Sequence, residues 1–362
     1  MGVARFHTAQ HHPKPFRTTR AASASAPRSR RGPVRKQIAL IATAGLLMAA
    51  LTACSSPGTA AADCDAPVTD GPASDLVSAT GDLGSAPTVD FPTPLKTDST
   101  ERAVLIAGDG ERTVSGQRMS IELSVYNGTT GELVEESTYE PNQAAPITLN
   151  DQALTGLRLG LTCAQAGSRV AIVVSPDDGF GPQDGNPQLG VAATDSLVFV
   201  IDVMKTYLTR ATGANQAPEP GLPSVVLNED GRPGITIPAG DVPTDLEVGV
   251  LKKGTGAKVE EGQVATLHYT GVIWSDEETI FDSTWENGAP APLLAVDGST
   301  TEGGIIPGFA TALIGQTVGS QIVAVIPPEL GYGASASGTI PANSTLIFVV
   351  DILGVDDAPG RG

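Results

Sequence analysis

The sequence predicts an α+β fold in which one β-rich unit with a single short helix occurs twice. Three observations lead to this prediction: strand-like segments in the second half of the chain, one short helical segment among them, and first-half residues that recur at a constant distance in the second half. A chain of 362 residues is long enough for about two or three domains. We therefore expect two tandem copies of one fold.

The strands are predicted from hydrophobic periodicity. Between Val264 and Val272 the residues alternate with period two, so Leu267 and Tyr269 share one strand face while His268 points the other way. The segment from Leu346 to Leu353 is almost continuously apolar and rich in β-branched residues. Such a composition is typical of a central strand that is buried on both sides.

The helix is predicted between Pro307 and Gly315. Proline is favoured in the first turn of a helix, and glycine is common near its end. Phe309, Ala312 and Leu313 then share the helix face that points inward.

The recurrence has two constant spacings. Six first-half residues recur 146 residues later, for example Gln117 as Gln263, and five others recur 152 residues later. The apolar ending from Ser196 to Val203 is matched by the segment from Thr345 to Ile352. The first half therefore contains its own copy of the predicted unit.

Five short motifs stand in a fixed order in the second half of the chain. They are HYTG (His268 to Gly271), FDS (Phe281 to Ser283), IPGF (Ile306 to Phe309), YG (Tyr332 to Gly333) and IP followed by L-x-F (Ile340 to Phe348). In this order and spacing they resemble the FKBP-type (macrolide-binding) peptidyl-prolyl isomerase domain. The resemblance covers about a quarter of the chain. It implies that each domain is a twisted antiparallel sheet wrapped around one short helix, with a pocket between them.

The resemblance implies nine pocket residues. The catalytic group is Tyr269, Phe281, Asp282, Ile306 and Tyr332, and the substrate-binding group is Ile305, Phe309, Ile340 and Phe348. The implied substrates are proline-containing segments of unfolded or partly folded proteins, with macrolides as further ligands and with no cofactor or metal. His268 is the only histidine after residue 53, and we interpret it as a structural polar residue.

The expected chemistry requires no nucleophile. A barrier of about 18–20 kcal/mol opposes rotation about the X-Pro amide bond. Rotation removes the resonance that places charge on the carbonyl oxygen, so the twisted amide loses less than the planar one in a dry pocket. The resemblance implies that the Tyr332 hydroxyl and the Ile306 N–H bind substrate carbonyls, and that Asp282 orients the polar edge near Tyr269.

Three features depart from the family pattern. Phe309 replaces the tryptophan that is usual at the pocket floor, Ala291 stands where many members carry an aromatic residue, and the segment from Leu293 to Gly304 is longer than usual. These changes bear on substrate preference and rate more than on the fold.

The first copy lacks the aromatic set. Alignment of the copies places Leu123 opposite Tyr269, Glu135 opposite Phe281, Glu136 opposite Asp282, Leu157 opposite Phe309 and Phe180 opposite Tyr332. A carboxylate in an apolar slot is costly to desolvate. We therefore expect a degenerate FKBP-like domain that is inactive, the alternative being an independent pocket with altered specificity.

The charge distribution argues against nucleic acid as a partner. Nine of the 22 Lys and Arg residues lie in residues 1–53, where there is no acid, so the remainder carries a net charge of −27. Binding to phosphate groups depends on Lys and Arg.

The first 53 residues are expected to be a lipoprotein signal peptide. A basic leader precedes the apolar segment from Ile38 to Ala53, which is short for a membrane span, and Leu51 to Cys54 resembles a bacterial lipobox. Lipidation of Cys54 would place the protein outside the cytoplasm, anchored to the membrane through lipid only. The alternative is a cleaved signal with a free Cys54.

Two further cysteines follow Cys54. Cys64 lies in a segment rich in Ser, Ala, Gly and Pro, which is typical of a flexible tether, and Cys163 lies in the first copy. In an oxidising compartment we expect a Cys64–Cys163 disulfide, the alternative being a buried thiol at Cys163 and a free Cys64.

The predicted organisation has six parts. These are a signal peptide (1–53), a flexible tether (54–86), a degenerate FKBP-like domain (87–204), a linker (205–221), an isomerase domain (222–354) and a tail (355–362). The predicted function is an extracytoplasmic prolyl isomerase that accelerates folding of secreted or cell-envelope proteins. The alternative is a non-catalytic chaperone or peptide-binding lipoprotein.

Overall fold

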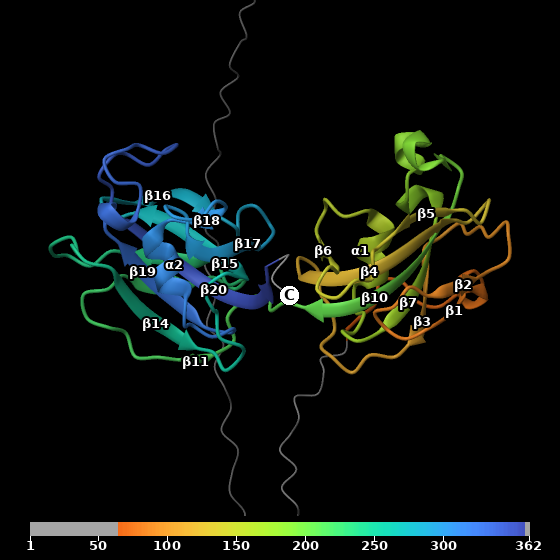
Figure 1. Cartoon of the computed structure of the whole chain (residues 1–362), viewed down its shortest axis with the longest axis horizontal. Helices are drawn as coiled ribbons and strands as arrows, with labels where there is room; N and C mark the ends of the chain where they lie inside the picture. The colour runs from red at the N-terminus through yellow and green to blue at the C-terminus, as the bar shows by residue number, and fades with distance from the viewer. Residues whose placement is uncertain (1–63, 359–362) are drawn as a thin grey trace, which may run out of the picture. The chain divides into compact units, whose positions relative to one another are not determined.

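The computed structural model describes residues 64–358, which contain two large, mainly antiparallel sheets with a short α-helix beside each (Figure 1). The first sheet has the strand order β3-β7-β10-β4-β5, and β6 also pairs with β4. Its strands are β3 (Glu101–Ile106), β4 (Arg118–Asn127), β5 (Leu133–Glu136), β6 (Ala145–Thr148), β7 (Arg169–Val174) and β10 (Leu197–Thr206). Helix α1 (Thr155–Leu161) connects β6 to β7.

The second sheet repeats this connectivity. Its order is β11-β14-β19-β20-β15-β17-β18, and β16 also pairs with β15. Its strands are β11 (Ala214–Asn215), β14 (Glu247–Lys253), β15 (Gln263–Ile273), β16 (Asp276–Ser283), β17 (Ala291–Asp297), β18 (Gly304–Ile305), β19 (Gln321–Ile326) and β20 (Leu346–Asp357). Helix α2 (Pro307–Leu313) connects β18 to β19. Thus β14, β15, β19 and β20 occupy the places of β3, β4, β7 and β10.

The apolar run of the last strand explains its place in the sheet. β20 pairs with β15 on one side and with β19 on the other, and its residues from Leu346 to Gly354 are buried. One of its faces packs toward α2 through Phe348 and Val350, and the other contributes Ile347 and Val349 to a second cluster. Burial on both faces is what selects the continuous apolar sequence.

Glycine allows each helix to pack closely on its sheet. A Cβ at Gly308 in α2 would collide with the side chain of Ile326 in β19, and a Cβ at Gly156 in α1 would collide with Val174 in β7. These two glycines are 152 residues apart in the chain. The same close contact therefore holds the helix of each copy against the core.

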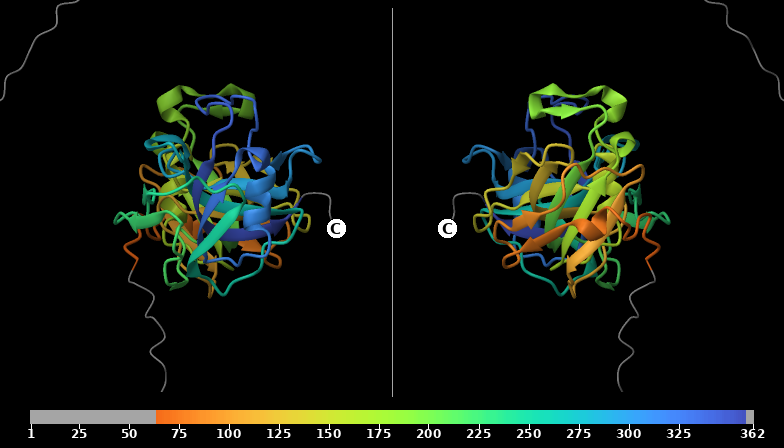
Figure 2. Two further views of the ribbon diagram at one scale, coloured as in Figure 1. Left: turned by 90° about the vertical axis from the view of Figure 1, so that its left-hand side faces the viewer. Right: turned by 90° about the vertical axis from the view of Figure 1, so that its right-hand side faces the viewer.

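A short β-hairpin covers the outer face of each sheet, the face that points away from the helix. The hairpin of β1 (Ser78–Thr80) and β2 (Thr88–Asp90), shown in orange in Figure 2, packs with the 3₁₀ turn η1 (Ser74–Leu76) on the first sheet. The hairpin of β12 (Ser224–Leu227) and β13 (Pro233–Thr236) packs on the second sheet. Each hairpin completes a small apolar cluster that the sheet alone would leave open.

A buried carboxylate holds the chain segment that precedes each sheet. In the first copy Asp202 forms an ion pair with Arg169 and accepts a hydrogen bond from the N–H of Gly84 at 2.7 Å. In the second copy Asp351 accepts from the side-chain amide of Gln321 at 2.6 Å and from the N–H of Ala211 at 2.7 Å. A carboxylate paired with a cation and a carboxylate held by neutral donors therefore occupy the same place in the two sheets.

The connections from β7 to β10 and from β19 to β20 differ between the copies in their short elements. After β7 the first copy has η2 (Pro176–Asp178), η3 (Gly181–Gln183), β8 (Gly185–Asn186), η4 (Pro187–Leu189) and β9 (Val191–Ala192). After β19 the second copy has only η5 (Pro328–Leu330) before a long loop. Both connections project from their sheets, as Figure 2 shows.

Several predicted boundaries differ from the observed ones. Residues 64–86 were expected in the flexible tether, but η1 and β1 lie within this range and pack on the first sheet. The predicted linker overlaps β10, which ends at Thr206, and the predicted tail overlaps β20, which ends at Asp357. The signal peptide, residues 54–63 and Cys54 lie outside the described residues.

Cys64 and Cys163 are joined by a disulfide with a Cα–Cα distance of 5.7 Å. Cys163 lies just after α1, and the bond closes a sequence separation of 99 residues. It therefore fixes the start of the described chain to the core of the first copy. Within residues 64–358, no helix has the length and apolarity to cross a membrane.

Candidate functional site

All nine pocket residues expected from the sequence line a single cavity of about 470 Å³ in the second copy. They come from β15 (Tyr269), β16 (Phe281, Asp282), β18 and the start of α2 (Ile305, Ile306, Phe309), the long loop after η5 (Tyr332, Ile340) and β20 (Phe348). Residues that are up to 79 positions apart in the chain are thus brought together by the sheet and the helix.

The base of the cavity is made of aromatic rings in contact. Phe309 and Phe348 are stacked, with ring centroids 4.6 Å apart and an interplanar angle of 19°. Phe281 meets Phe348 edge to face at 5.4 Å, and Tyr269 meets Phe309 edge to face at 5.9 Å. Phe309 is 4% exposed and Phe348 is 5% exposed, so the base is a fixed apolar surface.

The mouth of the cavity is polar on one side. The hydroxyl of Tyr269 donates a hydrogen bond of 2.6 Å to Oδ2 of Asp282. Burial and the neighbouring Asp282 carboxylate raise the pKa of the Tyr269 phenol above its usual value, so the phenol stays protonated and keeps donating. Tyr332 lies at the rim and is 39% exposed, which leaves its hydroxyl accessible to a ligand.

Ile306 links the cavity to the helix. It is the N-cap residue of α2, where its extended backbone conformation lets its carbonyl accept from the N–H groups of Phe309 and Ala310 at 3.0 and 3.1 Å. The start of α2, and with it Phe309, is therefore set by the same residue that lines the cavity.

Sequence reasoning missed five lining residues, which are Leu293, Gly304, Ser337, Gly338 and Thr339. Leu293 lies on β17 and pairs with Ala265 of β15, so the alternation of β17 contained a usable signal. Residues 337–339 belong to a loop without periodicity, and only the fold brings them to the cavity.

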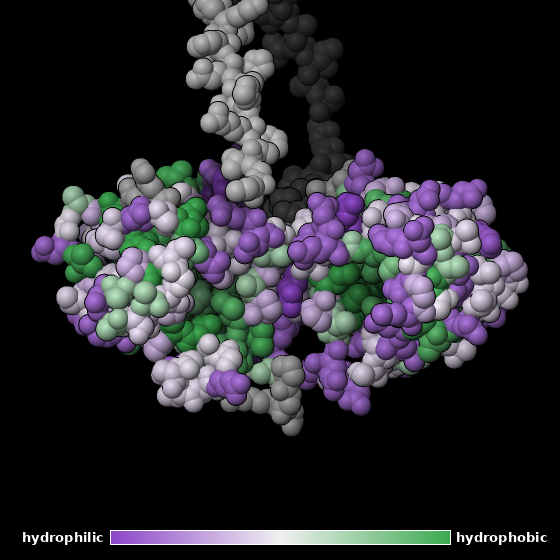
Figure 3. Space-filling view, turned by 90° about the horizontal axis from the view of Figure 1, so that it is seen from above, coloured by the Kyte–Doolittle hydropathy of each residue, from purple (hydrophilic) through white to green (hydrophobic). Residues whose placement is uncertain are grey.

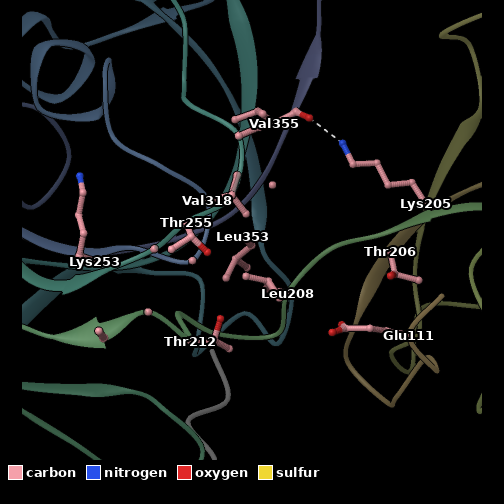
Figure 4. Close-up of a pocket in the computed structure, with 17 residues that line it drawn as sticks. Glu111, Lys205, Thr206, Leu208, Thr212, Lys253, Thr255, Val318, Leu353 and Val355 are labelled. Atoms are coloured by element: carbon pink, nitrogen blue, oxygen red, sulfur yellow. Dashed lines mark hydrogen bonds between the residues drawn. The ribbon is translucent and has the colours of Figure 1, made fainter. Parts of the chain in front are cut away.

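A larger cavity of about 590 Å³ has a different character (Figure 4). It is lined by five glycines and by Lys205, whose ammonium group donates to the carbonyl of Val355 and to Asp356 at 2.6 Å each. No aromatic ring lines it. Apolar side chains also gather in several patches on the face seen in Figure 3, so neither size nor surface apolarity identifies the site. The contiguous aromatic base does.

The described residues offer little for other kinds of chemistry. Within residues 64–358 no group of three or more His, Cys, Asp and Glu side chains could hold a metal ion. His268 is 8% exposed, and burial lowers its pKa to about 4. It points away from the cavity and contacts Thr284 and Trp285.

The structure corrects the alignment of the first copy by one residue. In the second sheet Thr270 pairs with Ser283, and in the first sheet the equivalent Ser124 pairs with Glu136. Val134 therefore stands opposite Phe281, and Glu135 stands opposite Asp282. The expected carboxylate in the apolar slot was wrong.

The corrected alignment still leaves the first copy without the aromatic base. Leu123, Val134, Leu157 and Phe180 pack as half-buried residues against its core, where the second copy has Tyr269, Phe281, Phe309 and Tyr332. Three of the four positions are aliphatic, so the difference between the copies lies in side-chain type and not in a misplaced charge.

Comparisons with known proteins point to one family. Residues 255–353 match the family described as FKBP-type peptidyl-prolyl cis-trans isomerase. The chain is 32% identical over 126 residues to the "FK506-binding protein" of Streptomyces anulatus, an alignment that covers 34% of this chain and 97% of that protein. It is 33% identical over 122 residues to the "Probable FK506-binding protein" of Corynebacterium glutamicum, covering 34% and 97% respectively.

Among solved structures, FkpA from Escherichia coli is 29% identical, covers 40% of this chain and 55% of its own, and has a TM-score of 0.29. The assignment depends on the sequence relatives, because the chain covers nearly all of two of them at more than 30% identity. The chain belongs to the family of FKBP-type peptidyl-prolyl cis-trans isomerases and is an enzyme of that class.

Proposed function

We propose that the second copy isomerises X-Pro bonds of secreted or cell-envelope proteins outside the cytoplasm. The observation that supports this proposal best is the cavity with an apolar aromatic base and a polar rim. A proline ring fits the base, while the flanking peptide carbonyls face the donors at the mouth.

Exclusion of water supplies the main catalytic effect. The planar amide places charge on its carbonyl oxygen, whereas the twisted amide is less polar. Phe281, Phe309 and Phe348 surround the prolyl ring with carbon, so the planar form loses more hydration than the twisted form does. Reducing tens of seconds to milliseconds requires a barrier lower by roughly 5 kcal/mol, and desolvation with one or two hydrogen bonds can supply it.

The polar groups orient the substrate. The exposed hydroxyl of Tyr332 donates to one substrate carbonyl, and the N–H of Ile306 donates to the next. The hydrogen bond between Tyr269 and Asp282 fixes the polar edge beside the base. Ile305 and Ile340 close the remaining sides of the slot. The same slot would accept the macrolide FK506, for which the bacterial relatives are named.

A refolding assay limited by proline isomerisation tests the assignment. Phe281→Ala should lower the catalysed rate strongly because it opens the base, and Asp282→Ala should lower it less because it removes only an orienting contact. The matched control is Val134→Ala. It shortens the side chain at the equivalent position of the first copy and should leave the rate unchanged. Unchanged rates in both Phe281→Ala and Asp282→Ala would remove these residues from the site.

We assign the first copy as a degenerate FKBP-like domain without isomerase activity. Its strand order and helix match those of the second copy, and its aliphatic residues replace the aromatic base. It can serve as a spacer or as a surface that holds clients near the active copy.

Anchoring of the protein through Cys54 is part of the proposal. The lipobox-like segment before Cys54 supports it. Fractionation of cells and mass measurement of the N-terminal peptide test it: the acyl groups and the membrane association should both be lost in Cys54→Ala. A soluble, unmodified wild-type protein would contradict it.

A further inference from the structure

The strand that carries Tyr269 has an interrupted edge. On one side β15 pairs with β20 along its whole length. On the other side its residues 264–267 pair with β17 and its residues 270–273 pair with β16. His268 and Tyr269 lie at the junction, where no ladder partner continues the edge. The backbone of a pocket residue is therefore left to other contacts.

Thr284 closes this gap. Its side-chain oxygen accepts a hydrogen bond from the N–H of Tyr269 at 2.8 Å, and its own N–H donates to the carbonyl of Tyr269 at 3.1 Å. Thr284 is 3% exposed. One residue thus binds both backbone polar groups of Tyr269, which would otherwise be unsatisfied on this side.

His268 in turn fixes the hydroxyl of Thr284. Nδ1 of His268 lies 2.9 Å from Oγ1 of Thr284, and the imidazole stacks on the indole of Trp285 with centroids 4.1 Å apart and an interplanar angle of 20°. The stack fixes the ring plane, and the hydrogen bond fixes the hydroxyl. Because burial keeps the imidazole neutral above about pH 4, this contact persists at working pH.

Comparison with the first copy shows which of these contacts both copies share and which only the second copy has. There the N–H of Leu123 donates to Oγ of Ser137 at 2.9 Å, and the N–H of Ser137 donates to the carbonyl of Leu123 at 2.8 Å. The hydroxyl closure is therefore common to both sheets. The imidazole is not, because Glu122 occupies the place of His268, and the stacked indole is absent as well, because Thr138 follows Ser137.

We propose that His268 is a positioning residue for the isomerase reaction. Through Thr284 it fixes the backbone of Tyr269, and it thereby keeps the tyrosine hydroxyl within hydrogen-bonding distance of Asp282. His268 itself touches no substrate. The imidazole and the indole are present in the copy that has the aromatic pocket, where the direction of Tyr269 determines both the edge contact with Phe309 and the hydrogen bond to Asp282. This inference rests on the proposed function of that pocket.

Two pairs of matched substitutions in the whole protein test the inference. The amide of His268→Asn can take the place of Nδ1 and bind Thr284, whereas the longer amide of His268→Gln reaches the place of Nε2. Thr284→Ser keeps the hydroxyl, and Thr284→Val replaces it with a methyl group of similar size. Isomerisation of a short proline peptide is measured as kcat/KM, and fluorescence of Trp274 and Trp285 reports folding of the second copy.

We expect His268→Gln and Thr284→Val each to lower kcat/KM by about five- to tenfold, the range given by loss of one orienting hydrogen bond. His268→Asn and Thr284→Ser should stay within about twofold of the wild type. The double variant His268→Gln, Thr284→Val should be no slower than either single variant, since both break one chain of contacts.

Two results would overturn the inference. One is a larger fall of kcat/KM in His268→Asn than in His268→Gln. That order would mean that residue 268 only fills space, because Asn is smaller than Gln and leaves the larger cavity. The other is full additivity in the double variant. An inactive wild type would instead reject the proposed function, so the two failures are distinguishable.

Discussion

The two sheets of this protein share a framework and differ in one set of side chains. Both have the same strand order, a helix packed through a glycine, a hairpin on the outer face and a buried aspartate on the last strand. The second has rings at all four of the pocket positions where the first has Leu123, Val134, Leu157 and Phe180, of which only Phe180 is aromatic. The contrast teaches that the fold needs only apolar residues of suitable size at these positions, and we expect the reaction to need aromatic ones.

The largest expected effect concerns the buried networks. Asp202→Asn leaves the Arg169 guanidinium buried without its anion, which should destabilise the first copy by about 3–5 kcal/mol. Gln321→Ala in the second copy removes a neutral donor and should cost only about 1–3 kcal/mol. Urea unfolding followed by circular dichroism and by tryptophan fluorescence separates the copies, since both tryptophans lie in the second. Equal costs would show that the ionic and neutral networks are equivalent.

The next effect is a pH dependence confined to the second copy. The folded pKa of His268 is about 4, below its unfolded value near 6.5. The contribution of the neutral imidazole to the free energy of unfolding is therefore complete above about pH 6.5 and is lost as the pH falls toward 4. Between about pH 6.5 and pH 4 the free energy of unfolding should fall by about 3 kcal/mol through His268. Asp351 has a raised pKa and acts in the opposite direction, so the comparison is made with His268→Asn, which does not titrate. Parallel stability curves for the two proteins would contradict this expectation.

Conversion of the second pocket into the first should abolish most of the activity. The triple variant Tyr269→Leu, Phe281→Val, Phe309→Leu carries the side chains of the first copy and should fold, because the first copy folds with them. We expect kcat/KM to fall about 100-fold, which is about 2.7 kcal/mol in the barrier. Tryptophan fluorescence checks folding, and a loss of less than about threefold would show that aromatic rings are dispensable.

The smallest effect concerns the rim. Tyr332→Phe reproduces Phe180 of the first copy and removes one hydroxyl that is exposed at the mouth. A fall of about fivefold in kcat/KM is expected, the value of one hydrogen bond to substrate. Phe180→Tyr in the first copy is the reverse change and should leave the rate unaltered. A response of the rate to Phe180→Tyr would give the first copy a part in the reaction.

The sequence predicted the pocket better than the boundaries. Five motifs located the pocket residues through the resemblance to a known domain, and the structure brings those on strands (Tyr269, Phe281, Asp282 and Phe348) together with those at the start of α2 and in the loop after η5. The alignment of Glu135 failed because a constant spacing of 146 was carried across the hairpin, whereas Tyr126 pairs with Leu133 and the equivalent Val272 pairs with Ile280, so the first hairpin is one residue shorter.

The tether was mispredicted for a different reason. Strands β1 and β2 have three residues each, which is too short for a visible alternation, and their partners in the apolar cluster lie about a hundred residues away. Strand β20 was ended early at Leu353 because polar residues follow it. Its pairing with β15 carries it on to Asp357.

The hydrogen bond of each buried aspartate to the segment before its sheet means that the folded domain begins upstream of its first long strand. A fragment that starts at residue 222 lacks Ala211, so Asp351 would lose its backbone donor while it remains inside the protein. A protease that cuts the chain just after Ala211 would thus separate this donor from the downstream enzyme even though every pocket residue survived. Any recombination that transplants this catalytic unit must carry the dozen or so residues upstream of it.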